Sequence, residues 1–168
     1  MGEQGFAGGK ERHIIFLQYV HWGRLRFRLS YWKNTNKKKE AKHKDITEKI
    51  IKSFYAVYNT LGYGFLEKVY ENALAIELHS EGLKVEQQSR LPVYYSNSLV
   101  GEYFADLLVN DKVIVELKAS RSLAPENEAQ LLNYLKATPY EVGLLLNFGP
   151  KPQIKRKTYD NLRKGNLS

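Results

Sequence analysis

The chain has 168 residues, a formal net charge of +8, no Cys and a single Met. This length suits one ordinary domain, which can bury most of its apolar surface without disulfide or metal staples. Hydrophobic residues make up 43% and charged residues 26% of the chain, so the composition is globular rather than disordered or membrane-like. The lack of Cys excludes a disulfide scaffold, a zinc ribbon and a thiol nucleophile, and it fits a reducing, cytoplasmic location.

The positive charge is concentrated at the two ends of the sequence. Residues 1–44 hold eleven Lys and Arg against three Glu, a net charge of +8, and residues 151–168 hold six against one Asp. Residues 45–150 hold nine against fourteen acidic residues, a net charge of −5. We therefore expect a basic N-terminal extension (1–44), a folded body (45–150) and a basic C-terminal tail (151–168), with phosphate contacts supplied by the ends.

The N-terminal extension opens with a Gly-rich stretch and closes with a basic run, a composition that we expect to be largely flexible. Arg24, Arg26 and Arg28 alternate with apolar residues, which predicts a short strand with one basic face. The apolar stretch 14–20 is too short to span a bilayer and no small-residue cleavage site follows it, so we expect no membrane-spanning segment and no signal peptide. The extension suits nucleic acid or acidic lipid, and a solubilising leader explains its composition equally well.

From Asp45 onward the hydrophobic pattern becomes regular. A helix is predicted over 46–60, opened by a capping box at 45–48, and a second helix over 65–78 follows two glycines. The pattern then predicts short strands at 85–88 and 91–95, strands at 99–109 and 112–119 joined by a turn at Asn110-Asp111, a helix at 126–137 and a buried strand at 142–148. The order α-α-β-β-β-α-β predicts a mixed α/β (α+β) fold with a sheet flanked by helices.

Three charged residues interrupt the apolar strands of the predicted hairpin. Asp106 lies in the first strand, and Glu116 and Lys118 share one face of the second because side chains alternate along a strand. A two-residue loop would turn Asp106 and Glu116 to opposite faces, whereas a three-residue loop, 110–112, or a bulge pairs them on one face. Buried charges need partners, so we predict the odd-length arrangement.

Two carboxylates as close together as Asp106 and Glu116 repel each other when both are ionised. A bound divalent cation is the natural way to stabilise both charges. Oxygen ligands alone favour Mg²⁺ or Mn²⁺ over Zn²⁺. Lys118 would then lie beside the ion, where its ammonium group can orient an attacking water or neutralise a phosphate oxygen. An ordinary salt-bridge ladder across a hairpin explains an acid-x-Lys strand equally well when the strand is taken alone.

Two separate motifs resemble those of a known family and occur in the order that the family has. The pattern Asp106 … Glu116-Leu117-Lys118 resembles the PD-(D/E)XK nuclease superfamily, although Ala105 stands where that motif has its Pro. The segment 64–70 reads Gly-x-x-Glu-x-x-Tyr and is similar to the signature of the GxxExxY branch of the superfamily. The resemblance covers about residues 45–150 and implies a restriction-endonuclease-like mixed sheet flanked by helices.

The resemblance also implies roles for individual residues. Asp106 and Glu116 would be the Mg²⁺ or Mn²⁺ ligands, the Leu117 carbonyl would supply a further oxygen, and Lys118 would assist the attacking water. Glu67 corresponds to an extra acidic residue near the metal.

Gln130 resembles a polar residue that often lies beside such a site, with Tyr134 one helical turn further on. Four of the matched residues also have purely structural explanations. Glu67 suits a solvated helix surface, Gln130 an incidental polar contact, Gly64 a backbone requirement and Tyr70 helix packing.

The function that we expect is Mg²⁺-dependent hydrolysis of phosphodiester bonds in DNA, or secondarily RNA. The alternative is a non-catalytic nucleic-acid-binding or adaptor module that keeps the nuclease fold, and a purely protein-binding role is left open by the aromatic content. Nucleic acid would be contacted by the three arginines of the extension and by Lys155, Arg156 and Lys157 of the tail. A homodimer is a further possibility, because many nucleases of this fold pair to cut both strands.

Overall fold

The chain divides into two units, Met1–Ala41 and Lys42–Ser168. The computed structural model describes residues 41–164, which make up nearly all of the second unit. Arg24, Arg26 and Arg28, with the strand predicted around them, lie outside the described residues.

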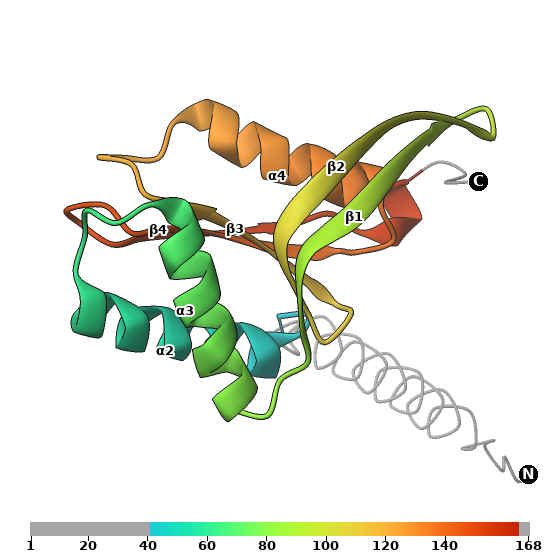
Figure 1. Ribbon diagram of the computed structural model, residues 1–168. Helices are drawn as coiled ribbons and strands as arrows, with labels where there is room; N and C mark the ends of the chain where they lie inside the picture. The colour runs from blue at the N-terminus through green and yellow to red at the C-terminus, as the bar shows by residue number, and fades with distance from the viewer. Residues whose placement is uncertain (1–40, 165–168) are drawn as a thin grey trace, which may run out of the picture. The chain divides into compact units, whose positions relative to one another are not determined.

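Three helices and a five-stranded sheet make up the described part of the chain (Figure 1). The elements are α2 (Lys44–Leu61), α3 (Glu67–Ser80), β1 (Val85–Tyr95), β2 (Ser98–Val109), β3 (Val113–Lys118), α4 (Pro125–Ala137), β4 (Val142–Asn147), β5 (Gln153–Thr158) and the 3₁₀ turn η1 (Asn161–Arg163). Spatial order in the sheet follows the chain from β1 to β5. The β3–β4 pair is parallel, with α4 as the crossover between its strands, and the other pairs are antiparallel. This order confirms the predicted α+β architecture.

Helices cover both faces of the sheet, α2 and α3 on one side and α4 on the other (Figure 1). The larger apolar core lies between the sheet and the α2–α3 layer, and it includes Phe54, Tyr70 and Phe148, all fully buried. A smaller core under α4 includes Leu131 and Leu135. Since β3 and β4 are covered on both faces, they consist of nearly continuous apolar runs, as buried parallel strands do. In such surroundings each polar residue of β3 is conspicuous.

The β2–β3 hairpin has the odd-length loop that its charged residues require. Residues 107–109 pair with 113–115 in antiparallel register, and the loop is 110–112. Asn110 and Asp111 both adopt left-handed φ values, 51° and 54°, which Asn and Asp tolerate better than most other residues with a Cβ. The prediction of a three-residue connection is confirmed.

Three local predictions differ from the structure. The first helix begins at Lys44 rather than after a capping box at Asp45: its N-cap is His43, with φ of 54° and no side-chain cap. The strands predicted separately at 85–88 and 91–95 form one strand, β1, in which Pro92 is tolerated because β1 is an edge strand. The expected C-terminal tail contains β5, which pairs with β4 along six residues.

Within the described residues, every helix is too short or too polar to traverse a lipid bilayer.

Candidate active site

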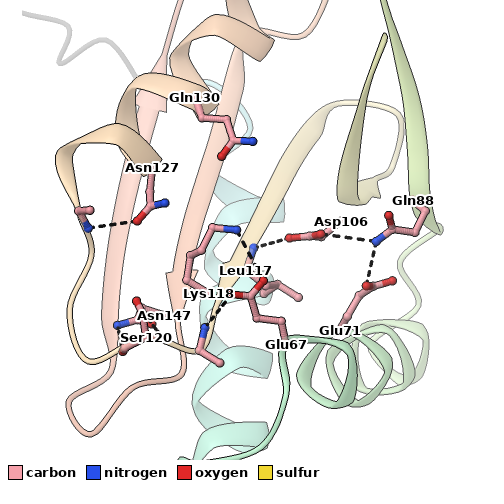
Figure 2. A network of polar contacts seen from close by, with 12 residues as sticks. Glu67, Glu71, Gln88, Asp106, Leu117, Lys118, Ser120, Asn127, Gln130 and Asn147 are labelled. Atoms are coloured by element: carbon pink, nitrogen blue, oxygen red, sulfur yellow. Dashed lines mark hydrogen bonds and ion pairs between the residues drawn. The ribbon is translucent and has the colours of Figure 1, made fainter.

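The hairpin strands β2 and β3 separate just beyond their last ladder pair, and the two carboxylates lie at that point. The register that pairs Leu107 with Val115, continued by one residue, sets Asp106 opposite Glu116. Beyond the ladder a side chain takes over from the backbone, since the Leu117 N–H donates to Asp106 Oδ2 at 2.7 Å (Figure 2). The Asp106 carboxylate is therefore fixed in direction by the neighbouring strand.

Glu116 is a buried acid that lacks a full set of partners. Its side chain is 4% exposed, and its Oε1 atom accepts no hydrogen bond. Burial, and secondarily the negative charge of Asp106, raises the pKa of Glu116 to about 8, while Lys118 acts in the opposite direction. Burial also raises the pKa of Asp106, against the lowering effect of the Leu117 N–H bond. A buried, unpartnered carboxylate oxygen is costly unless something else neutralises it.

Lys118 is anchored to the helix layer by the first residue of α3. Glu67 Oε2 lies 3.7 Å from the Lys118 ammonium nitrogen, and Glu67 Oε1 accepts the Ala119 N–H at 3.3 Å. The Glu67 side chain is 48% exposed and that of Lys118 is 21% exposed, so the ion pair lies at the rim of the site. Figure 2 shows these side chains converging between β3 and the start of α3.

The other two residues of the Gly-x-x-Glu-x-x-Tyr segment have backbone and packing roles. Gly64 has a φ of 111°, which a residue with a Cβ adopts only with strain. The buried Tyr70 hydroxyl donates to the Gly62 carbonyl at 3.0 Å and accepts the Phe65 N–H at 3.2 Å, so it holds both ends of the loop that precedes α3. Together they fix the position at which Glu67 enters the site.

The donors gathered here suit a hard divalent cation. Asp106 and Glu116 offer carboxylate oxygens, and backbone alternation turns the Leu117 carbonyl towards the same side, because the Lys118 carbonyl accepts the Phe148 N–H on the β4 side at 2.7 Å. Across residues 41–164, no group of three or more Cys, His, Asp or Glu side chains is arranged to hold an ion, so main-chain and solvent oxygens would have to complete the coordination. The orphaned Glu116 Oε1 is the observation that fits a cation best.

Comparison with known proteins agrees with this geometry. A family model described as the PD-(D/E)XK nuclease superfamily matches residues 44–157, which is more than half of the chain. The chain belongs to the PD-(D/E)XK nuclease superfamily. No curated protein and no solved structure matches it. The match begins at the first residue of α2 and extends into β5, so this superfamily domain includes part of the segment that composition alone would set aside as a basic tail.

Gln130 reaches the site through Tyr134 rather than directly. Gln130 Nε2 donates to the Tyr134 hydroxyl at 2.5 Å, which agrees with the expectation that the two side chains share a helix face. Burial, followed by the negative charge of Glu116, raises the pKa of Tyr134 to about 12. Figure 2 draws no contact from Gln130 to Asp106, Lys118 or Glu67. Gln130 therefore contacts Tyr134, and it is Tyr134 that senses the charge of Glu116.

The loop that follows Lys118 is held by a buried amide. Asn147, at the end of β4, accepts the Ser120 N–H at 3.0 Å and donates to the Ser120 carbonyl at 2.9 Å. Asn147 also donates to Gln153 Oε1 at 3.1 Å, and that oxygen accepts the Leu123 N–H at 3.0 Å. A Cβ on Gly149 would lie 2.0 Å from the Ser120 carbonyl oxygen, so only Gly fits there. These contacts fix the backbone immediately after Lys118.

The predicted basic cluster of the tail is divided between the two faces of β5. Lys157 forms an ion pair with Glu128 of α4, and Lys155 lies 3.7 Å from the same carboxylate. Arg156 points the other way and donates to the Lys42 carbonyl at 2.6 Å. Because Glu128 neutralises part of their charge, the two lysines present a weaker positive surface than the sequence suggests.

Two residues near the carboxylates were not anticipated from the sequence. Glu71 lies one turn after Glu67 on α3 and is 4% exposed, and the Gln88 amide of β1 lies between Glu71 and Asp106. The i, i+4 spacing of the two glutamates is a signal that marks Glu71 as sharing the face of Glu67. No comparable pattern in the sequence singles out Gln88.

Proposed function

We propose that the protein is a divalent-metal-dependent nuclease that hydrolyses phosphodiester bonds of DNA, with RNA as the secondary substrate. Membership of a nuclease superfamily supports nuclease activity in general. The observation that carries the proposal for this chain is the buried Glu116 carboxylate, whose Oε1 has no hydrogen bond and which lies opposite Asp106 on the diverging strands. We further propose that the chain falls in the GxxExxY branch and acts in the cytoplasm.

In the proposed mechanism Asp106, Glu116 and the Leu117 carbonyl would hold Mg²⁺ or Mn²⁺. When bound, the ion supplies a Lewis acid that polarises the scissile phosphate and lowers the pKa of the attacking water. The Leu117 N–H donates to Asp106 Oδ2 and so orients that carboxylate towards β3. Glu116 contributes a charge that is unfavourable in the absence of the ion and favourable in its presence.

Lys118 is proposed to steer the water and to neutralise charge that develops on the phosphate. Its ammonium group is on the same strand face as Glu116, and it is held at 3.7 Å by Glu67. Gln130, next to Tyr134, would contact the substrate or a water beside the site.

The test is cleavage of labelled single- and double-stranded DNA and RNA with Mg²⁺, Mn²⁺ or EDTA. We expect wild-type cutting that needs the metal, and losses of more than about 100-fold in Glu116→Gln and in Lys118→Ala with the fold retained. Glu86→Gln, which alters an exposed acid of β1, is the matched control and should cut like the wild type.

Two results would contradict the proposal. Activity that persists in both Glu116→Gln and Lys118→Ala would assign the cutting to a contaminant. No turnover with any metal, combined with tight and strongly salt-dependent nucleic acid binding, would identify the alternative, a non-catalytic binding or adaptor module. Mass measurement in solution during the same series would establish whether the active species is a homodimer.

A further inference from the structure

Strand β1 has a left-handed residue directly opposite Asp106. Residues 85–87 and 89–91 of β1 pair with β2 in one unbroken register, and in that register the position across from Asp106 belongs to Gln88. Gln88 has a φ of 52°, whereas strand residues ordinarily have strongly negative values. Gln gains no local side-chain bond from this conformation, as Asn or Asp can, so the surroundings must enforce it.

The kink directs the Gln88 side chain between two acids. Gln88 Nε2 donates to Glu71 Oε2 at 2.9 Å and lies 3.5 Å from Asp106 Oδ1 (Figure 2). Glu71 is buried and is itself held in place, because its Oε1 accepts from Lys68 at 2.6 Å and from Gln87 at 2.9 Å. The Gln88 amide is therefore fixed on the side away from Asp106 and presents its nitrogen to the carboxylate.

The two oxygens of Asp106 are thus restrained by different strands. Oδ2 accepts the Leu117 N–H from β3 at 2.7 Å, and Oδ1 faces the Gln88 amide from β1 at 3.5 Å. An oxygen with one lone pair directed at an amide keeps the other free for a cation, and contacts at both oxygens limit the rotation of the carboxylate away from Glu116. Mutation of a partner that orients a metal ligand in this way typically lowers metal affinity by about 10–100-fold.

We propose that Gln88 is a positioning residue for the metal centre, using its left-handed backbone and its contact with Glu71 to restrain Asp106 for cation binding. The inference rests on the proposed function, since it takes Asp106 as a ligand. It also gives the strained backbone a reason to persist, because only this kink brings a β1 amide between the two acids.

The test uses Mn²⁺ as the probe and calorimetric titration of the full chain as the readout, beside thermal melting in EDTA. Gln88→Asn keeps the amide and tolerates a positive φ, but its side chain is too short to bridge the two acids. Gln88→Gly removes the side chain at a position where Gly is unstrained. Glu86→Gln is the control, because Glu86 is an exposed neighbour on β1 and makes no hydrogen bond or ion pair with Glu71 or Asp106 within residues 41–164.

We expect both Gln88 variants to bind Mn²⁺ about 10-fold more weakly than the wild type, or weaker still, with melting temperatures in EDTA close to the wild type. Glu86→Gln should bind Mn²⁺ within about twofold of the wild type. Wild-type affinity in both Gln88 variants would overturn the role of Gln88 and leave the proposed metal centre intact. Lower melting temperatures with unchanged affinity would assign Gln88 a structural role only. If the wild type fails to bind Mn²⁺, or binds it as well after Asp106→Ala, the proposed centre and the role of Gln88 fail together.

Discussion

The Tyr70 ring stacks on the Phe148 ring with centroids 4.2 Å apart and planes inclined by 10°. Both rings are fully buried, and they join the helix layer to the end of β4, immediately after Asn147. At the tip of the ring, the Tyr70 hydroxyl contacts both ends of the loop that precedes Glu67. Tyr70 therefore links the core to Glu67, which contacts Lys118, and through Phe148 to the end of β4, where Asn147 holds the loop after Lys118.

Tyr70→Phe should separate the packing role of this ring from its polar role. The stack on Phe148 is kept, but the Gly62 carbonyl and the Phe65 N–H lose their partner, which should lower the unfolding free energy by about 1–2 kcal/mol. Urea denaturation measures this loss. Tyr63→Phe in the same loop is the control, because Tyr63 is 61% exposed and has no hydrogen bond from its hydroxyl within residues 41–164, and it should be neutral. Equal stability of both variants would show that the loop does not depend on the hydroxyl.

The pKa of Glu116 predicts how the stability of the metal-free protein varies with pH. Its folded pKa of about 8 lies above its ordinary value of 4.5, so between these values the folded protein retains a proton that the unfolded chain has released. The unfolding free energy therefore falls as pH rises through this window, by about 1.4 kcal/mol per unit of pKa difference at most. The raised pKa of Asp106 acts in the same direction.

Melting curves in EDTA from about pH 5 to about pH 8.5 measure this effect. Over this pH range the melting temperature of the wild type should fall by roughly several degrees more than that of Glu116→Gln, whose side chain cannot ionise. Excess Mg²⁺ should reverse most of the loss in the wild type and little in the variant, because an ion that binds the charged form favours the folded state. Parallel pH profiles of the two proteins would show that Glu116 is not the titrating group.

The pairing of Asp106 with Glu116 can be predicted from the sequence, because it depends only on side-chain alternation and on whether the hairpin loop has an odd or an even number of residues. Side-chain alternation and the length of the 110–112 loop are enough to set Asp106 opposite Glu116, and the structure has that loop. The helix positions also follow from periodicity, although α2 begins one residue before Asp45, the residue predicted to cap it. Local patterns therefore predict which residues share a face more reliably than where an element starts.

The features that the sequence does not predict depend on distant partners. Strand β5 has one apolar side chain, Ile154, that packs against the core and otherwise carries polar or basic residues, so it becomes a strand only because β4 offers a free edge. The left-handed φ of Gln88 has no local signal, because the side-chain contacts of Gln88 are with Glu71 and Asp106, which are distant in sequence. Nothing local to Lys155 and Lys157 indicates their pairing with Glu128.

Gly149→Ala tests the close contact that fixes the backbone after Lys118. An added Cβ would lie 2.0 Å from the Ser120 carbonyl oxygen and 2.9 Å from the Asn147 amide nitrogen, so one of the two backbone segments must move. We expect a loss of about 1–3 kcal/mol in unfolding free energy, typical of overpacking. Gly101→Ala in β2 is the control. A Cβ added at Gly101 would have no heavy atom within 4 Å, so the stability of this variant should equal that of the wild type. Similar urea midpoints for both variants would contradict the close contact.

Glu128→Gln tests whether the β5 lysines contact nucleic acid. Glu128 pairs with both Lys155 and Lys157, and these pairs hold the pKa of its carboxyl below the ordinary value, so it stays charged and competes with phosphate. Removing that charge should tighten binding to a duplex in EDTA and steepen the salt dependence by up to about 2 units of slope, if both lysines then contact phosphates. Fluorescence anisotropy over a salt series measures affinity and slope together.

The matched control for this experiment is Glu126→Gln, which removes the same charge from α4 but frees no lysine, because Glu126 forms no ion pair within the described residues. A general effect of net charge would shift both variants equally, whereas a direct role for the two lysines shifts only Glu128→Gln. Lys157→Gln should then weaken binding in the Glu128→Gln background more than in the wild type, since only there is the ammonium group released from its carboxylate. An unchanged slope in Glu128→Gln would mean that the nucleic acid is bound elsewhere on the protein, and the basic residues of β5 would then serve mainly to pin α4 to the sheet edge.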